Sequence, residues 1–470
     1  MKKFNKDSYL KKLKLKRNWQ RFSKYFCVGI PCVLCLVLGI YFAYSKFFVS
    51  KEQSVVRTTV GDFIYGDVVI NAYIDGEYSS TIPGKNDGYV VENVACDNGA
   101  VGKWNNDKWG LLTTNLSKRT KCNVYFKKVV SKVSDIIAQL DTTGKCPTMN
   151  ADGSVNVTGV EATNGYLCKA KDAYGDSYYY RGNVTNNYVK FADKYWRIVR
   201  INGDGTVRVI YDGTSAHANG ESSSDRQIGT SAFNSSSNDN AYVGYMYGTT
   251  GASSYAAAHA NTNDSTIKTY IDNWYKTNMF GTTNEQYLAD NVFCNDRSIS
   301  TYTTSSNTKL GYGTNSTYYR WVYSPWNGTN YGNMTMMLTC PQKNDAFTVS
   351  DSTNGNGALT YPVGLLSTDE IVLAGGWNAS NIGYYLCSGG IWWASSPFNF
   401  GGYSAYVRRV NSDGSASNAY LVDGYYGVRP VFNLKAEVLK YGNGTASNPY
   451  RLTESLKSYE GEGGETGGFE

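Results

Sequence analysis

The chain has only two histidines, His217 and His259, and none of the seven cysteines after the amino-terminal apolar run forms a Cys-x-x-Cys pair. Zinc sites are built from closely spaced Cys and His ligands, so the sequence predicts no metal centre and no bound cofactor. Charged residues make up only 18% of the chain, and no carboxylate pair stands in a pattern typical of acid–base catalysis. Both histidines lie away from nucleophile motifs and are expected in exposed loops. We therefore predict that the protein is not an enzyme.

Positive charge is unevenly distributed. The first 24 residues hold ten Lys or Arg and one acid, a local charge of +9, whereas the whole chain carries +6. The remainder is therefore slightly acidic, which argues against nucleic acid as a partner. Residues 25–45 follow without a charge, and a helix of about 20 apolar residues crosses a bilayer. We predict a basic cytoplasmic segment (1–24), a single transmembrane helix (25–45) in a bacterial cell membrane, and extracellular domains beyond it.

A secretory signal peptide is the alternative interpretation of this run. Ala43, Tyr44 and Ser45 place small residues near a possible cleavage site. The apolar regions of signal peptides are usually about 7–15 residues, which is shorter than this one and favours a retained anchor. Both interpretations place the rest of the chain outside the cytoplasm.

Seven cysteines follow the apolar run. Pairing each with its neighbour in sequence gives Cys96–Cys122, Cys146–Cys168 and Cys294–Cys340, and leaves Cys387 over. Disulfides are typical of exported proteins. A sequence does not fix connectivity, so other pairings stay open. Cys387 is expected to be a buried, inert thiol.

The exported part divides into two predicted domains. Residues 55–128 show short apolar runs separated by turn signals such as Asp75-Gly76, which predicts a small all-β, Ig-like sandwich acting as a spacer. Residues 129–145 form a linker with a short helix. Residues 146–440 form a large domain, and residues 441–470 a disordered tail rich in Gly and Glu.

Strand and helix signals alternate within the large domain. Alternation in 195–211 around Asn202-Gly203-Asp204-Gly205 predicts a hairpin. Apolar spacing predicts one helix at Ser265–Thr277 capped by Asp264, and a second begins with a capping-box pattern at Ser367–Glu370. We therefore expect an α+β fold in which Asp369 and Glu370 serve a helix start, not catalysis.

The segment from Gly390 to Leu434 carries the clearest functional signal. Its two ends contain conformationally restricted residues such as Pro397 and Pro430. Its middle is rich in Phe, Tyr, Asn, Ser and Gly, a composition suited to binding another molecule. Trp392, Trp393 and Arg429 are expected in the core, with Arg429 organising buried hydrogen bonds. The predicted ligand-binding residues are Phe398, Asn399, Phe400, Tyr403, Tyr406, Asn418, Tyr420, Tyr425 and Tyr426.

Three motifs of the large domain carry a family resemblance: residues 195–205, Trp392-Trp393 with Ser396-Pro397, and the closing residues 427–434. Together they resemble an uncharacterised family of bacterial surface domains related to the formylglycine-generating-enzyme fold, a variant of the C-type lectin fold. The resemblance covers residues 146–440 and implies a mixed α+β core with a loop-rich, ligand-facing side. The final segment also resembles the variable lectin-like proteins of diversity-generating retroelements, in which residues ahead of a closing Gly-x-Arg vary.

The enzymes of that fold bind copper through two nearby cysteines. Here Cys340 and Cys387 are the only candidates, and neither lies in a matching motif. We therefore predict a cell-surface, adhesin-like or receptor-like protein whose lectin-like head binds an external glycan or protein. A formylglycine-generating-type oxidoreductase and a structural envelope module are the alternatives.

Overall fold

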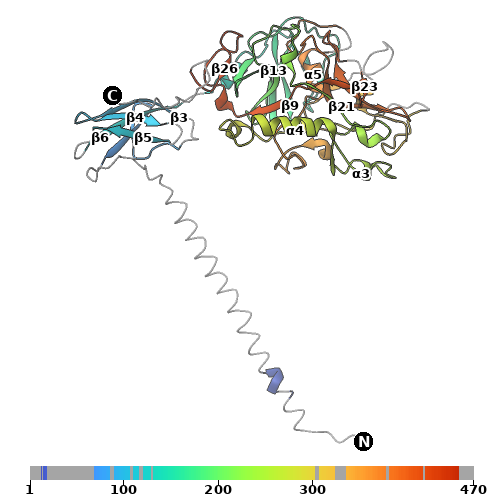
Figure 1. Ribbon diagram of the computed structural model, residues 1–470, viewed down its shortest axis with the longest axis horizontal. Helices are drawn as coiled ribbons and strands as arrows, with labels where there is room; N and C mark the ends of the chain where they lie inside the picture. The colour runs from blue at the N-terminus through green and yellow to red at the C-terminus, as the bar shows by residue number, and fades with distance from the viewer. Residues whose placement is uncertain are drawn as a thin grey trace, which may run out of the picture. The chain divides into compact units, whose positions relative to one another are not determined.

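The computed structural model describes residues 12, 14–17, 68–84, 89–105, 109–115, 120–128, 131–301, 306–322, 335–376, 380–416 and 419–454. The chain divides into two compact units, Met1–Lys128 and Val129–Glu470 (Figure 1). The predicted transmembrane helix at 25–45 lies outside the described residues, as do most of 1–24 and residues 455–470. Among the residues that are described, no helix is both long and apolar enough to cross a membrane.

In the smaller unit the described residues 12 and 14–17 are helical, whereas from residue 68 onwards its described part is built from strands. These are β1 (Val69–Ile74), β2 (Glu77–Ser79), β3 (Tyr89–Cys96), β4 (Val101–Asn105), β5 (Gly110–Thr114) and β6 (Lys121–Lys128). Four strands form one sheet in the order β2-β1-β6-β3, with β1 and β6 parallel, and β4 and β5 form a separate hairpin.

The core of this unit lies between the sheet and the hairpin. Trp104 and Leu111 of the hairpin pack with Val124 and Phe126 of β6, and Trp104 meets Phe126 edge to face with ring centroids 5.2 Å apart. Because the second layer is only a two-stranded hairpin, the predicted Ig-like sandwich of two full sheets is wrong for the described strands.

Two larger sheets form the second unit. The first has the order β25-β13-β12-β10-β9, with β11 pairing with both β12 and β26, and the second has the order β14-β24-β21-β22-β23, with β18 also pairing with β21. The strands of the first sheet are β9 (Tyr166–Asp172), β10 (Gly175–Arg181), β11 (Tyr188–Phe191), β12 (Lys194–Ile201), β13 (Val207–Gly213), β25 (Val431–Leu434) and β26 (Tyr450–Arg451). The strands of the second are β14 (Thr230–Ala232), β18 (Thr317–Tyr318), β21 (Trp392–Phe400), β22 (Ala405–Val410), β23 (Ala419–Leu421) and β24 (Tyr425–Gly427).

Short two-residue strands complete the unit in three small sheets. They are β7 (Thr148–Met149), β8 (Val155–Asn156), β15 (Met246–Tyr247), β16 (Asn263–Asp264), β17 (Phe293–Cys294), β19 (Thr335–Met336) and β20 (Ala346–Phe347). The predicted hairpin at 195–211 is confirmed, since β12 and β13 pair antiparallel across it.

Helices are few and short in the described part of this unit. The α-helices are α2 (Val133–Ile137), α3 (Tyr255–Ala258), α4 (Thr266–Asn278) and α5 (Thr368–Ala374), and the 3-10 turns are η1 (Ser224–Arg226), η2 (Asn240–Val243), η3 (Glu285–Tyr287), η4 (Arg320–Val322), η5 (Lys343–Asp345) and η6 (Ala436–Val438). The expectation of an α+β fold is therefore wrong, because the described part of the unit is mostly β. The reason is local: its long Ser- and Asn-rich stretches fold into side-chain-capped turns, which compete with helix formation.

Helix α4 covers one face of the first sheet. Its Trp274 lies 6.4 Å from Trp196 of β12 and 6.1 Å from Phe432 of β25, measured between ring centroids (Figure 1). Ser265 caps α4, not Asp264 as the sequence suggested. The predicted capping box at the start of α5 is confirmed, with Ser367 and Glu370 bonding each other's backbone.

Three disulfides cross-link the chain: Cys96–Cys122, Cys146–Cys168 and Cys294–Cys340. Each joins cysteines that are neighbours in sequence. Cys387 is free and buried. In the small unit the bond joins residues directly opposite each other on β3 and β6, so it ties two strands of one sheet.

One turn motif recurs three times, with the sequence Asn-x-Asp-Gly-Ser/Thr at 150–154, 202–206 and 411–415. In each copy the Asp carboxylate accepts from the backbone N–H and the hydroxyl of the final residue, and the Asn amide donates to that hydroxyl. The Gly has a positive φ of 85°, 82° and 81° respectively. The last two copies close the hairpins β12–β13 and β22–β23.

The left-handed glycine of this motif gives a prediction. A Cβ at Gly205 would meet no atom within 4 Å, so Gly205→Ala adds backbone strain without a clash. We expect it to lower the free energy of unfolding by about 1–2 kcal/mol, measured by urea denaturation. Gly205→Asn should recover most of this loss, because Asn tolerates the left-handed region. Equal stability of the Ala variant and the parent would show that the turn does not need this conformation.

Candidate functional site

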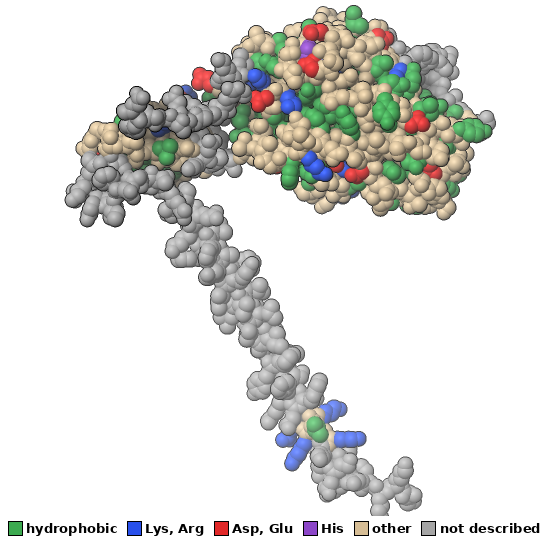
Figure 2. All heavy atoms as spheres, viewed as in Figure 1, with side chains coloured by type: hydrophobic (Ala, Val, Ile, Leu, Met, Phe, Trp, Pro, Cys, Tyr) green, Lys and Arg blue, Asp and Glu red, His purple; other side chains and the backbone are tan. Residues whose placement is uncertain are grey.

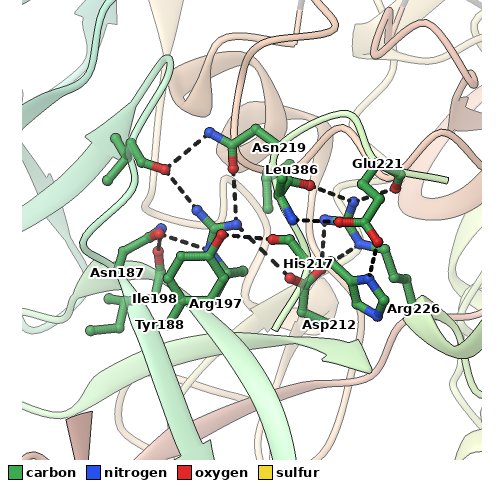
Figure 3. Close-up of polar contacts among 12 residues, drawn as sticks. Asn187, Tyr188, Arg197, Ile198, Asp212, His217, Asn219, Glu221, Arg226 and Leu386 are labelled. Atoms are coloured by element: carbon green, nitrogen blue, oxygen red, sulfur yellow. Dashed lines mark hydrogen bonds and ion pairs between the residues drawn. The ribbon is translucent and has the colours of Figure 1, made fainter. Parts of the chain in front are cut away.

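A buried cluster of polar side chains, the polar centre, surrounds Asp212 in the large unit. Through Arg429 it links β13 of the first sheet to the residues before β21 and before β25. Asp212, on β13, accepts hydrogen bonds at Oδ1 from Arg226 of η1 (Nε, 3.0 Å; Nη2, 2.8 Å) and from Arg429 (Nη2, 2.7 Å). A third guanidinium, that of Arg197 on β12, lies 3.9 Å from Oδ2 (Figure 3). All four side chains are buried, so three positive charges converge on one carboxylate away from water.

Each of the three arginines also donates hydrogen bonds to other oxygen atoms of the protein. Arg429 donates to the carbonyls of Tyr211 and Leu386, and Arg226 donates to those of Ala218 and Glu221. Burial lowers the pKa of Arg429 to about 10, which still leaves it charged at neutral pH. The sequence-based expectation that Arg429 organises buried hydrogen bonds is confirmed.

His217 lies at the edge of this centre, held between two carboxylates. Its Nδ1 lies 2.9 Å from Glu221 Oε1 (Figure 3). Its Nε2 lies 2.8 Å from Asp225 Oδ1. Burial opposes the charged imidazolium, but the bonds to Glu221 and Asp225 outweigh it, so the pKa of His217 is raised. The pKa values of both carboxyls are lowered, although burial opposes this for Asp225, because of hydrogen bonds that include those to His217.

The sequence-based placement of both histidines in exposed loops is wrong. His217 and His259 are buried. Burial, followed by the nearby Arg297, lowers the pKa of His259 to about 2, so it is neutral at physiological pH. The spacing His217-x3-Glu221-x3-Asp225 was the available signal for the His217 arrangement, but it lies in an irregular segment where spacing alone predicts no contact.

A second ionic cluster surrounds the start of α5. Glu370 pairs with Arg200 of β12 and Arg208 of β13, and Asp369 pairs with Arg320. A small pocket of about 10 Å³ is lined partly by these groups. Asp172 also pairs with Arg200 and Asp296 with Arg320, so each arginine of this cluster has a carboxylate partner and the ion pairs fix the helix against the first sheet.

The predicted ligand-binding segment forms much of the second sheet, whose β21 and β23 lie at one end of the large unit (Figure 1). Backbone hydrogen bonds tie its loops together: Val422 donates to Ala405, Ala405 donates to Ser237, and Asn234 donates to Val422. The Ser237 hydroxyl also bonds Asp423. Residues 403–405, 420–425 and 234–237 therefore meet in one region of the surface.

In this region the rings of Tyr420 and Tyr426 both contact the guanidinium group of Arg409. The Arg409 guanidinium carbon lies 3.1 Å from the ring centroid of Tyr420 and 4.3 Å from that of Tyr426. The two rings meet edge to face at 5.5 Å, and Tyr426 contacts buried Trp393 in the same way at 5.1 Å. Trp393 is fixed in turn by a hydrogen bond to the Ser231 carbonyl. We call Arg409, Tyr420 and Tyr426 the tyrosine clamp.

Exposed aromatic surface concentrates in this region. Tyr403 is 90% exposed, Tyr425 is 72% exposed and Tyr420 is 39% exposed. With Leu421, these make four of the seven large hydrophobic side chains that are exposed in the described part of the large unit. Figure 2 shows such side chains as separate patches on a surface with few charges.

The other predicted ligand-binding residues lie elsewhere. Phe400 is fully buried, and Phe398 packs over the buried guanidinium of Arg408. Tyr406 pairs with Leu421 across β22 and β23, one position from the pair Val407–Tyr420, so Tyr406 and Tyr420 point to opposite faces of the sheet. Asn399 is half-buried on β21, and Asn418 lies outside the described residues.

The cysteines bear on the alternative oxidoreductase interpretation. Cys340 is bonded to Cys294, so it is not a free thiol that could share a metal ion with Cys387. Burial raises the pKa of Cys387, which keeps its thiol protonated. No group of three or more His, Cys, Asp or Glu side chains suited to a metal ion occurs in the described part of the chain.

Comparison with known proteins adds one finding. A family model described as a domain of unknown function (DUF6273) matches residues 215–436. This stretch contains His217, the tyrosine clamp and Arg429. No curated protein and no solved structure gives a significant match. The resemblance to the formylglycine-generating-enzyme and lectin-like families therefore stays untested.

The polar centre gives a second prediction. Asp212→Asn leaves three buried guanidinium groups without a counter-charge, so we expect the free energy of unfolding to fall by about 3–5 kcal/mol. Tryptophan fluorescence during urea unfolding would measure this. Asp176→Asn removes an exposed pair with Lys169 and should change stability by less than about 1 kcal/mol. Similar losses in the two variants would contradict a central role for Asp212.

His217 gives a third prediction, on pH dependence. A pKa raised in the folded state means that protonation stabilises the fold, fully below the unfolded value of about 6.5. This contribution is lost as pH rises through the folded pKa. His217→Gln should therefore destabilise the protein more near pH 5.5 than near pH 8.5, in urea unfolding at both values.

His259→Gln is the matched control for that experiment. The folded-state pKa of His259 lies far below the unfolded value of about 6.5, so near pH 5.5 His259 is protonated only in the unfolded state. Its substitution should therefore show the opposite trend and destabilise the protein less near pH 5.5 than near pH 8.5. A pH-independent effect of His217→Gln would show that the two carboxylates do not hold a charged imidazole.

Proposed function

We propose that the protein is a ligand-binding protein of an oxidising compartment outside the cytoplasm, and that it captures an external partner with the exposed tyrosines around the tyrosine clamp. The observation that carries this proposal is the exposure of Tyr403, Tyr420 and Tyr425 near one end of the second sheet, where Arg409 supports the Tyr420 ring. Large exposed aromatic side chains that gather in one region mark binding surfaces more often than chance exposure does.

The chemistry of the region favours binding over catalysis. Tyrosine contributes a large contact area for little loss of rotamer entropy. Tyr420 is already fixed by Arg409, and Tyr426 by Trp393, so little further order is lost when a partner binds. The three disulfides support an oxidising location.

Binding by the full-length protein to a printed array of surface glycans and extracellular proteins tests the proposal. We expect a signal on at least one array member and a loss of about tenfold or more in affinity for the double variant Tyr420→Ala/Tyr425→Ala. Tyr406→Ala is the matched control, since Tyr406 lies on the other face of the same hairpin and should bind as the parent does.

Two outcomes would contradict the proposal. Binding that survives in the double variant would place the site elsewhere on the molecule. An empty array with correctly folded protein would favour a structural role for the large unit.

A further inference from the structure

We infer that the site at the tyrosine clamp binds a neutral carbohydrate, with a sugar ring stacked on Tyr420. This inference rests on the proposed function and specifies its ligand. It follows from three features of the site: the way the Tyr420 ring is covered, the lack of exposed Lys or Arg in residues 227–245 and 391–434, and the polar groups around it.

Tyr420 presents one face of its ring. The guanidinium of Arg409, only 6% exposed, covers the ring at 3.1 Å, while the residue as a whole keeps 39% of its surface exposed. A ring that is supported from behind and open in front is a flat apolar platform. The C–H face of a pyranose ring matches such a platform in size and polarity.

The charges of the site argue against an ionic ligand. The only basic residues between Ile391 and Leu434 are Arg408, Arg409 and Arg429, and all three are buried. Residues 227–245, which supply the neighbouring strand and loop, contain no Lys or Arg. An anionic polymer would therefore find no exposed cation on these segments to compensate its charge.

The acids of the same segments are already engaged. Asp413 accepts two hydrogen bonds from Ser415, and Asp423 accepts one from Ser237. Exposed hydroxyl and amide groups at Ser235 and Asn238 flank this contact. Hydroxyl-bearing neutral ligands exchange hydrogen bonds with such groups without losing a charge to burial.

A protein partner fits these features less well. Stable protein interfaces bury about 800 Å² on each side around a continuous apolar core. Here the exposed aromatic residues are Tyr403, Tyr420 and Tyr425, each with a polar hydroxyl. Single rings set among hydroxyl groups suit the alternating apolar faces and hydroxyls of a saccharide chain.

Isothermal titration calorimetry of the full-length protein tests the inference with three probes: a neutral hexasaccharide of glucose or N-acetylglucosamine, a uronic-acid oligomer, and a proline-rich peptide. We expect a neutral hexasaccharide to bind, with an affinity that changes less than about twofold between about 50 and 500 mM NaCl. Tyr420→Ala should weaken this binding about tenfold or more, whereas Tyr420→Phe, which keeps the ring, should stay within about twofold of the parent.

Arg409 acts as a positioning residue, and its role has a separate readout. Arg409→Lys keeps the charge but loses the planar group that supports the ring. We expect it to weaken saccharide binding while the urea midpoint stays close to that of the parent. Tyr406→Ala, on the opposite face, should change neither quantity.

The outcomes separate the two proposals. If the uronic-acid oligomer or the peptide binds in a Tyr420-dependent way and neither neutral saccharide does, the proposed function stands and the carbohydrate assignment is overturned. If no probe binds in a Tyr420-dependent way although the array has shown Tyr420-dependent binding, the carbohydrate assignment again fails alone. Loss of Tyr420 dependence in both experiments overturns both proposals.

Discussion

The large unit depends on the burial of Asp212 among three arginines. In the interior an uncompensated charge is far more costly than in water, so each guanidinium needs its carboxylate and its carbonyl oxygens in place at once. The participating groups come from β12, β13, η1, the residues before β21 and the residues before β25. A shift of any one of these segments leaves a charge unpaired, and this fixes their relative positions.

This constraint reaches the tyrosine clamp through the closing residues of the second sheet. Arg429 lies two residues after Gly427, where a Cβ would meet the Ile391 carbonyl at 2.8 Å, so only glycine lets β24 lie this close to β21. Trp392 packs under the Arg429 guanidinium, and its neighbour Trp393 supports Tyr426. The rings of Tyr420 and Tyr426 therefore pack on the buried side chains of Arg409 and Trp393.

Much of the local structure followed from the sequence. Hairpin β12–β13 and the capping box of α5 could be predicted because their signals lie within a few residues of one another. The burial of His217 and the opposite faces of Tyr406 and Tyr420 could not be predicted. Both depend on contacts between distant segments, and a shift of one residue in strand pairing moves a side chain to the other face.

The sequence by itself determined that the chain outside its amino-terminal region is rich in strands and turns, that Arg429 is internal, and that aromatic residues gather before residue 427. Only the tertiary structure decided which of those aromatic rings face water and which support them. Turn and capping signals act through neighbouring backbone groups and are therefore encoded locally. The exposure of an aromatic ring and the pairing of buried charges depend on how strands that are distant in sequence pack together. Amino-acid composition does not determine that packing.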